Sequence, residues 1–320
     1  MALFDYRLVS HLPQELLKDK PDWSPFSILN TTRPEWLNHR ADWLHILPHS
    51  GEGRDVKRYN ATPTNLFSSH YDSEKEAESV SIFDPFLCEL MYKWFSKKDM
   101  KILDPFAGGN VRGLVAETLG RNYVGIDLSS TQVTANNSSQ KTFEGKFVDI
   151  QGTAEWVCGD SADILNEQSF IEKYGQFDML FTCPPYYNLE QYTKNPADLS
   201  RMPTYADFLT KFGKILQSAC RCLKDGTFCC IVISELRQSP QDMEKIQFYG
   251  LVPDTVHILR DLCGMKYYNE IILVNSLGSL PIRANKYFNQ SRKIGRHHQN
   301  ILVFYKGNIR DIEGKFGPLG

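Results

Sequence analysis

Residues 184–186 are two successive prolines followed by a tyrosine, a combination that could bind an amine for a chemical reaction. Cys183, Pro184, Pro185 and Tyr186 follow Thr182, which comes directly after the largely apolar run 177–181. The two prolines fix two φ angles and remove two N–H donors, so the loop presents stiff carbonyl acceptors. Tyr186 supplies a flat face on which a planar ring can stack. The pattern predicts a site that accepts hydrogen bonds from an amine beside an aromatic plate.

The exocyclic amine of a nucleobase is a poor nucleophile, because its lone pair is delocalised into the ring. Holding both of its N–H groups, with the carbonyl of Pro184 and the side chain of Cys183, favours tetrahedral geometry at nitrogen. The lone pair is then directed at an electrophilic methyl group. We therefore interpret residues 183–186 as the catalytic loop of an amino-methyltransferase, and a plain Pro-Pro turn is the alternative.

A glycine-containing turn at 104–110 follows a short β-like run and precedes an amphipathic stretch. In doubly wound sheets this is the crevice where nucleotides bind. Asp127 ends the next β-like run, where a carboxylate can accept hydrogen bonds from two ribose hydroxyls. The pair predicts a nucleoside-containing cofactor, and a tight turn with a solvated aspartate is the alternative.

The residues of this turn indicate which cofactor is bound. Dinucleotide sites use G-x-G-x-x-G to seat a pyrophosphate at a helix N-terminus, but this turn begins with Asp104 and Phe106. An acid there would repel a diphosphate and suits the ammonium group of an amino-acid tail, which favours S-adenosyl-L-methionine over NAD. Asp160 follows the third run, where it could accept from the adenine amino group or cap the next helix.

From residue 101 onward, short β-like runs alternate with amphipathic stretches, which predicts an α/β fold with a doubly wound, mostly parallel sheet. The last two predicted strands, 267–275 and 300–305, flank a basic loop rather than a helix, so we expect an antiparallel pair at one edge. The domain prediction is an N-terminal extension packed on the core (1–75), a catalytic domain (76–310) and a C-terminal tail (311–320).

The overall charge excludes nucleic-acid binding by bulk attraction. The 320 residues include 36 Lys and Arg against 38 Asp and Glu, a formal net charge of −2. Any polyanion site must therefore be a local patch. The segment 281–300 contains no acid and interleaves Tyr287 and Phe288 with basic residues, so we predict phosphate contacts there, with a solvated loop as the alternative. The predicted contact residues are Arg283, Lys286, Arg292, Lys293 and Arg296.

Other features exclude further classes of protein. No stretch approaches the roughly 18 uncharged apolar residues that a membrane span needs. The eight cysteines form no C-x-x-C pair and lie mostly in apolar runs, so we expect reduced thiols, no metal site and a cytoplasmic protein.

Residues 104–110 and 182–186 together resemble the signatures of the amino-group DNA methyltransferases, D-P-F-x-G-S-G and [D/N/S]-P-P-[Y/F], whose products are N4-methylcytosine or N6-methyladenine. The segments 83–90, 278–283 and 292–300 are similar to phage and prophage-type DNA methylases. This similarity runs from about Trp36 to Gly307, in one of the motif orders that the superfamily uses.

The resemblance implies a Rossmann-like methyltransferase sheet that binds S-adenosyl-L-methionine and acts on a base flipped out of single- or double-stranded DNA. It would place Phe83 and Asp84 at the methionine end of the cofactor, and Asp127 at its ribose. Asp104, Phe106 and Gly108 would lie along its middle.

Two departures from the family pattern leave the exact target open. Asn110 replaces the last glycine of the turn, which is tolerable because Asn visits left-handed backbone more readily than most residues. Cys183 stands where Asp, Asn or Ser is usual and is nearest in size to Ser, which favours N4 of cytosine over N6 of adenine. C5-cytosine chemistry, an RNA base methyltransferase and a non-catalytic DNA-binding module remain alternatives, and the oligomeric state is open.

Overall fold

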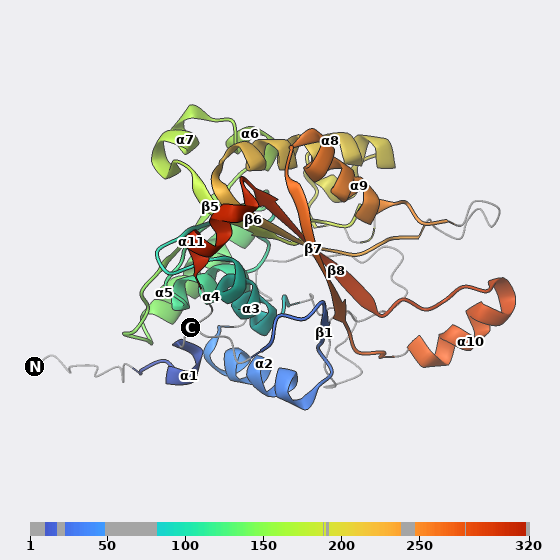
Figure 1. Ribbon diagram of the computed structural model, residues 1–320, viewed down its shortest axis with the longest axis horizontal. Coiled ribbons are helices and arrows are strands. Elements are labelled where there is room, and N and C mark those ends of the chain that lie inside the picture. The colour runs from blue at the N-terminus through green and yellow to red at the C-terminus, as the bar shows by residue number, and fades with distance from the viewer. Residues whose placement is uncertain are drawn as a thin grey trace, which may run out of the picture.

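The computed structural model describes residues 10–17, 23–48, 82–187, 189, 192–237, 247–278 and 280–317, and within them an eight-stranded β-sheet forms the centre of the molecule (Figure 1). The strands are β1 (Ile28–Asn30), β2 (Lys101–Asp104), β3 (Asn122–Asp127), β4 (Thr153–Cys158), β5 (Phe177–Thr182), β6 (Leu223–Ile233), β7 (Lys266–Val274) and β8 (His298–Lys306). Their order across the sheet is β1-β7-β8-β6-β5-β2-β3-β4.

Strands β2 to β6 run parallel and are joined by helices that cover both faces of the sheet (Figure 1). Alternate strand residues point to opposite faces, so Ile102 packs in one apolar core and Leu103 in the other. The connecting helices are α4 (Val111–Thr118), α5 (Ser130–Glu144), α6 (Ser161–Ile164), α7 (Gln168–Tyr174) and α8 (Tyr205–Arg221). This arrangement confirms the predicted doubly wound, mostly parallel Rossmann-like sheet.

Strand β8 lies antiparallel to both β6 and β7, which confirms the predicted antiparallel pairing. The outermost strand beyond β7 is β1, which pairs with it in parallel through Ile28 to Ile272 and Asn30 to Val274. Three residues are too few to show a strand period, and for this reason the sequence pattern did not reveal β1.

The described part of the N-terminal region packs on the sheet and on one helix of the core. It contains α1 (Gln14–Leu17), β1 and α2 (Pro34–Ile46), and α2 lies against α3 (Pro85–Phe95). Trp36 and Trp43 of α2 are fully buried. The indole of Trp43 donates to Glu89 Oε2 at 2.5 Å and that of Trp36 to Asp84 Oδ2 at 2.9 Å, so both indole N–H groups have an acceptor on or next to α3.

One prediction about the C-terminal region is wrong: the basic segment between β7 and β8 contains a helix, α10 (Leu280–Ser291). Pro281 stands in its first turn, where a missing N–H costs no hydrogen bond. The polar composition of the segment favoured a loop, but a proline in the first turn is compatible with a helix start. α10 projects from the body of the molecule at the end of the β7–β8 pair (Figure 1).

Shorter elements complete the described chain: a 3₁₀ turn (Leu199–Arg201), α9 (Leu251–His257), a π-helical turn (Ile258–Leu262), a second 3₁₀ turn (Ile309–Asp311) and α11 (Ile312–Phe316). Among the described residues, the helices are all too short or too polar to cross a membrane.

A buried acid in α4 predicts a pH-dependent stability. Glu117 is fully buried, its Oε2 accepts from Gln140 Nε2 at 2.9 Å, and burial raises its pKa from 4.5 to about 8. Between these values the folded protein keeps a proton that the unfolded chain has released, so the free energy of unfolding falls as the pH rises. The fall amounts to about 5 kcal/mol at most.

We expect Glu117→Gln to remove most of this dependence, because the amide cannot ionise. Urea unfolding of both proteins at pH 5 and at pH 8.5 measures it. Equal losses of stability in wild type and variant over this interval would show that Glu117 does not titrate as proposed.

Candidate active site

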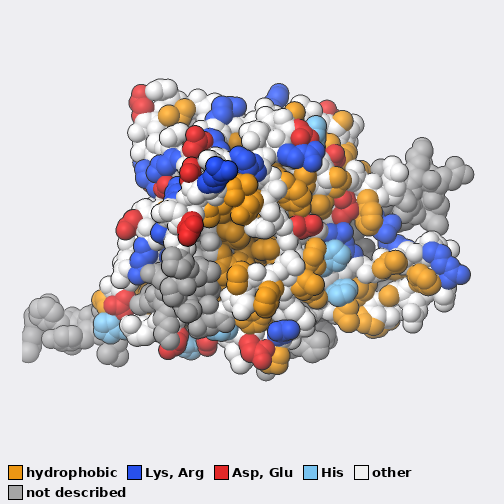
Figure 2. Space-filling model, viewed as in Figure 1, with side chains coloured by type: hydrophobic (Ala, Val, Ile, Leu, Met, Phe, Trp, Pro, Cys, Tyr) orange, Lys and Arg blue, Asp and Glu red, His pale blue; other side chains and the backbone are white. Residues whose placement is uncertain are grey.

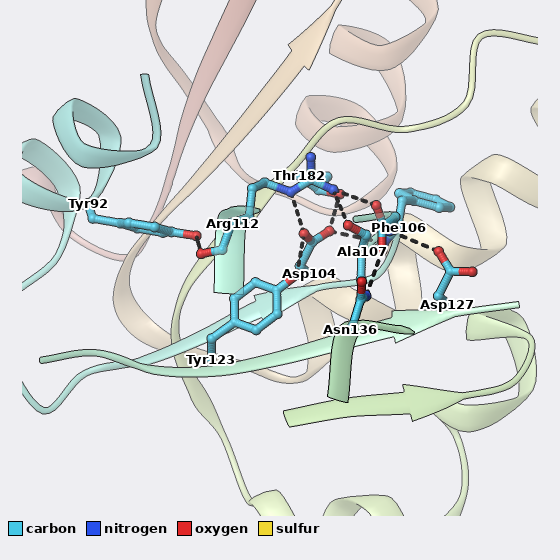
Figure 3. A network of polar contacts seen from close by, with 10 residues as sticks. Tyr92, Asp104, Phe106, Ala107, Arg112, Tyr123, Asp127, Asn136 and Thr182 are labelled. Carbon is cyan, nitrogen blue, oxygen red and sulfur yellow. Dashed lines mark hydrogen bonds and ion pairs between the residues drawn. The ribbon is translucent and has the colours of Figure 1, made fainter. Parts of the chain in front are cut away.

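The glycine turn and the Pro-Pro-Tyr loop lie side by side at the carboxyl edge of the sheet. Strands β2 and β5 pair in parallel, with Leu103 beside Leu180, so the loops that follow them leave the sheet together. Thr182 Oγ1 donates a hydrogen bond to Asp104 Oδ1 at 2.6 Å (Figure 3). Thr182 therefore contacts the predicted cofactor turn directly, and the predicted catalytic residues 183–186 start at the next position in the chain.

Asp104 is fully buried at the centre of a polar network (Figure 3). Its Oδ2 accepts from Arg112 Nε at 2.6 Å and from Tyr123 OH at 2.8 Å. Burial disfavours the charged guanidinium, yet the facing Asp104 carboxylate leaves the pKa of Arg112 above its usual range. The charge of Asp104 is thus neutralised inside the protein, which removes the argument that this acid receives the ammonium group of a cofactor.

Arg112 also fixes the shape of the glycine turn. Its Nη2 donates to the carbonyls of Phe106 at 2.7 Å and Ala107 at 2.9 Å. The ring of Phe83 lies 4.6 Å from the guanidinium carbon, which places Phe83 next to the turn, and its contact with the methionine end of a cofactor stays a prediction. The roles of Arg112, Tyr123 and Thr182 were not predicted, although Arg112 lies in a segment that resembles the methylases.

Asp127 borders the same turn from the end of β3. Its Oδ2 accepts from the backbone N–H of Gly108 and its Oδ1 from that of Ser129, each at 2.8 Å. Asn136 Nδ2 of α5 donates to the carbonyl of Gly108 at 2.8 Å. Gly108 has φ 53°, a left-handed conformation that glycine adopts without steric cost. The turn and its acid are therefore held in place by hydrogen bonds at the carboxyl edge of the sheet, where Asp127 is half-buried.

The turn also contains a side-chain oxygen that could accept a hydrogen bond from a ligand. Asn110 Oδ1 is buried and makes no hydrogen bond among the residues that the structure describes. A buried acceptor without a partner is costly, so a donor supplied by a ligand or by water would stabilise this turn. Together with the half-buried carboxylate of Asp127, this fits a nucleoside cofactor that carries hydroxyl and amino donors.

Asp160 caps the N-terminus of α6, which is one of the two roles predicted for it. Its Oδ1 accepts from the backbone N–H of Ala162 at 2.9 Å, and its Oδ2 accepts from Lys211 Nζ at 2.6 Å. The neighbouring Ser161 donates to the carbonyl of Pro105 at 2.6 Å, which ties the start of α6 to the glycine turn. A contact of Asp160 with adenine stays a prediction.

Asp84 contacts residues of both α2 and α3. This residue is 2% exposed, its Oδ1 caps α3 by accepting from the backbone N–H of Phe86, and its Oδ2 accepts from the indole of Trp36 at 2.9 Å. Burial raises the pKa of Asp84, and the nearby Arg40 of α2 opposes that rise. These contacts make Asp84 a residue that joins α2 to α3, and its predicted place at the methionine end of the cofactor stays a prediction.

The two tyrosines of the Pro-Pro-Tyr loop face different surroundings. Tyr186 OH accepts from Gln299 Nε2 of β8 at 3.0 Å and lies 3.8 Å from Cys183 Sγ. Tyr187, at φ 33°, packs its ring against the aromatic cluster formed by Tyr205, Phe208 and Tyr249. Tyr186 is therefore the residue beside the predicted amine site, and Gln299, which was not predicted as a site residue, positions it.

The predicted phosphate-binding residues separate into two groups. Lys286 is exposed on α10, and the side chains of Arg292 and Lys293 lie over the rings of Phe288 and Tyr287. Arg296 is instead half-buried against β8: its Nε donates to the carbonyl of His298 at 3.2 Å, and its Nη2 contacts Asn300. Burial lowers the pKa of Arg296. The side chain of Arg283 lies outside the described residues.

Part of the chain matches a known family model. Residues 30–138 match the family model for N6/N4 methyltransferases described as DNA methylase. No curated protein matches the chain in sequence. Solved structures that resemble it include TrmN from Thermus thermophilus, at 12% identity and a TM-score of 0.41, covering 70% of this chain and 49% of that one. The match thus spans about half of the TrmN chain.

Two other solved structures carry related descriptions. One is an S-adenosylmethionine-dependent methyltransferase from Methanosarcina mazei, at 14% identity and a TM-score of 0.45, covering 68% of this chain and 97% of that one. The other is a Thermus thermophilus protein assigned as a DNA modification methylase and solved with S-adenosyl-L-methionine, at 18% identity and a TM-score of 0.34, covering 47% of this chain and 51% of that one.

The family match supports the resemblance inferred from the motifs, while the phage type stays a prediction. Over residues 30–138, which include α3, the glycine turn and Asp127, the chain carries the sequence features of the N6/N4 family of DNA methylases.

Proposed function

We propose that the protein transfers a methyl group from S-adenosyl-L-methionine to the exocyclic amino group of a DNA base, with N4 of cytosine preferred over N6 of adenine. The observation that carries this proposal is the contact between Thr182 and Asp104. It joins a loop suited to holding an amine to a turn suited to holding a nucleoside cofactor. The family match of residues 30–138 supports DNA as the substrate.

The cofactor would lie along the glycine turn, with its ribose at Asp127 and its methionine part toward Phe83. When bound, S-adenosyl-L-methionine supplies the electrophilic methyl group. Arg112 holds the carbonyls of Phe106 and Ala107 in place, so the turn needs no rearrangement to receive a ligand. Rigid positioning of this kind lowers the entropic cost of bringing two reactants together.

The Pro-Pro-Tyr loop would orient the base. The Pro184 carbonyl and Cys183 Sγ accept the two N–H groups of the amine, and the ring of Tyr186 stacks on the base. In the transfer that the bound cofactor would supply, the amine nitrogen would form the new bond to the methyl carbon as the carbon–sulfur bond breaks with its electron pair going to sulfur. The nitrogen would then release one proton to water. Tyr186 is 8% exposed, so entry of the base requires its surroundings to open.

Asp127 gives a direct test of the proposed cofactor site. We expect Asp127→Asn to weaken S-adenosyl-L-methionine binding by about 10- to 100-fold, because hydrogen bonds to a charged group contribute about 1.5–3 kcal/mol. Isothermal titration calorimetry measures the Kd. The matched control is Asp225→Asn, an exposed carboxylate near the opposite end of the sheet, which should bind as wild type does.

Substrate class is tested by methyl transfer from tritiated S-adenosyl-L-methionine to duplex DNA, single-stranded DNA and tRNA. The proposal expects label in DNA. Transfer to tRNA alone would identify an RNA methyltransferase, and cofactor binding that Asp127→Asn leaves unchanged would contradict the assigned cofactor site.

A further inference from the structure

We propose that α10 enters the major groove of duplex DNA and reads base edges with Asn285 and Asn289 while Lys286 contacts the phosphate backbone. This inference rests on the proposed function, and it assigns to α10 the choice of target sequence.

One side of α10 is covered by the chain that returns to β8. Leu280 lies so close to Gly295 that a Cβ atom there would meet Leu280 Cδ1 at 2.8 Å. The ammonium of Lys293 lies 5.3 Å from the ring of Tyr287, and the guanidinium carbon of Arg292 lies 5.0 Å from that of Phe288. The helix is thus held against a short return segment, 292–295, which fixes its orientation.

The opposite side of α10 faces solvent. At 3.6 residues per turn, Ile282, Asn285, Lys286 and Asn289 fall on one face of the helix, and all four are exposed, Ile282 to 82%. Exposed apolar and basic side chains gather around the projecting helix (Figure 2). This face carries two amide side chains and one basic side chain but no acid, so it is suited to a polar, negatively charged partner.

The charge of the segment indicates a polyanion. Residues 276–299 include five Lys and Arg, Arg283, Lys286, Arg292, Lys293 and Arg296, and no Asp or Glu, in a chain whose net charge is −2. Attraction to DNA phosphates is therefore concentrated at the place where the helix projects. A protein partner would need a matching acidic surface, whereas duplex DNA provides the negative charge in any sequence.

The dimensions and side chains favour the major groove. A 12-residue helix is about 18 Å long and about 10–12 Å across, and the major groove is about 12 Å wide. The amide of Asn can donate to and accept from adenine N6 and N7, and an apolar side chain such as Ile282 can contact the thymine methyl group. Asn285 and Asn289 are one helical turn apart, so they can reach neighbouring base pairs.

The experiment uses the full chain and a randomised duplex library, with bound sequences selected and counted. Asn285→Ala with Asn289→Ala should reduce the preference for the selected bases by about 10- to 100-fold, the usual value of a bidentate base contact. Lys286→Ala should weaken binding to all sequences alike and reduce the slope of log K against log salt by about one. The controls are Asn269→Ala and Lys97→Ala, exposed residues of β7 and of the turn before β2.

The outcomes separate this inference from the proposed function. A preference and salt slope that the α10 variants leave unchanged, in a protein that still methylates DNA, would overturn the role of α10 alone. Binding that depends on α10, in a protein that transfers no methyl group, would support the role of α10 and overturn the proposed catalysis. All side chains changed are exposed, so the thermal unfolding midpoints should match that of wild type.

Discussion

Tyr186→Ala is expected to lower methyl transfer to DNA by about 100-fold or more while S-adenosyl-L-methionine still binds. Stacking of a base on an aromatic ring contributes about 1–3 kcal/mol, and a misplaced reacting group can cost about another 100-fold. The affected step is the positioning of the amine, so single-turnover transfer rates with saturating cofactor measure it directly. Calorimetry on the same variant shows whether cofactor binding is retained.

Two conservative changes distinguish the ring of Tyr186 from its hydroxyl. Tyr186→Phe keeps the stacking surface and loses the hydroxyl contacts with Gln299 and Cys183, so a fall of about tenfold or less is expected. Tyr187→Phe loses a 3.4 Å contact with the carbonyl of Pro203 and should leave the rate unchanged. Full activity in Tyr186→Ala would show that this ring is not the stacking surface.

Asp104→Asn is expected to have the largest effect on stability, because it leaves the buried guanidinium of Arg112 without its counter-charge. Removing one partner of a buried ion pair costs about 3–5 kcal/mol. Asp104 also accepts from Tyr123 and Thr182, so both the glycine turn and the start of the Pro-Pro-Tyr loop should loosen. Urea unfolding measures the loss, and calorimetry should show weaker cofactor binding.

The matched control is Glu155→Gln, which removes the carboxylate from an exposed pair with Lys173. A surface ion pair contributes about 1 kcal/mol or less. If Asp104→Asn were no more destabilising than this control, the charge pair at the centre of the site would not hold the two loops together.

The regular parts of the fold could be predicted because each depends on local pattern. Apolar runs ending in Asp104, Asp127 and Thr182 identify parallel strands, and parallel strands bring their carboxyl ends to one edge of the sheet. By that rule the loops after these strands lie at one edge, and the 2.6 Å contact between Thr182 and Asp104 agrees with it.

The roles of individual side chains depend on partners far away in the chain, which local pattern does not reveal. The sequence around Asp84, for example, does not reveal that Trp36, 48 residues earlier, donates to its carboxylate. Gln299 reaches Tyr186 across 113 residues because β8 inserts between β6 and β7. α10 was missed for a different reason: its helical signal is weak in sequence, since its stabilising contacts come from the return segment around Gly295.

The central claim is that this site methylates the amino group of a DNA base. Incubation of DNA with the protein and S-adenosyl-L-methionine carrying a CD₃ methyl, followed by mass spectrometry of the nucleosides, tests it directly. We predict CD₃ on N4 of cytosine. CD₃ on N6 of adenine would support the same transfer to an exocyclic amino group and identify adenine as the target base. DNA that carries no CD₃ on either amino group would contradict the claim.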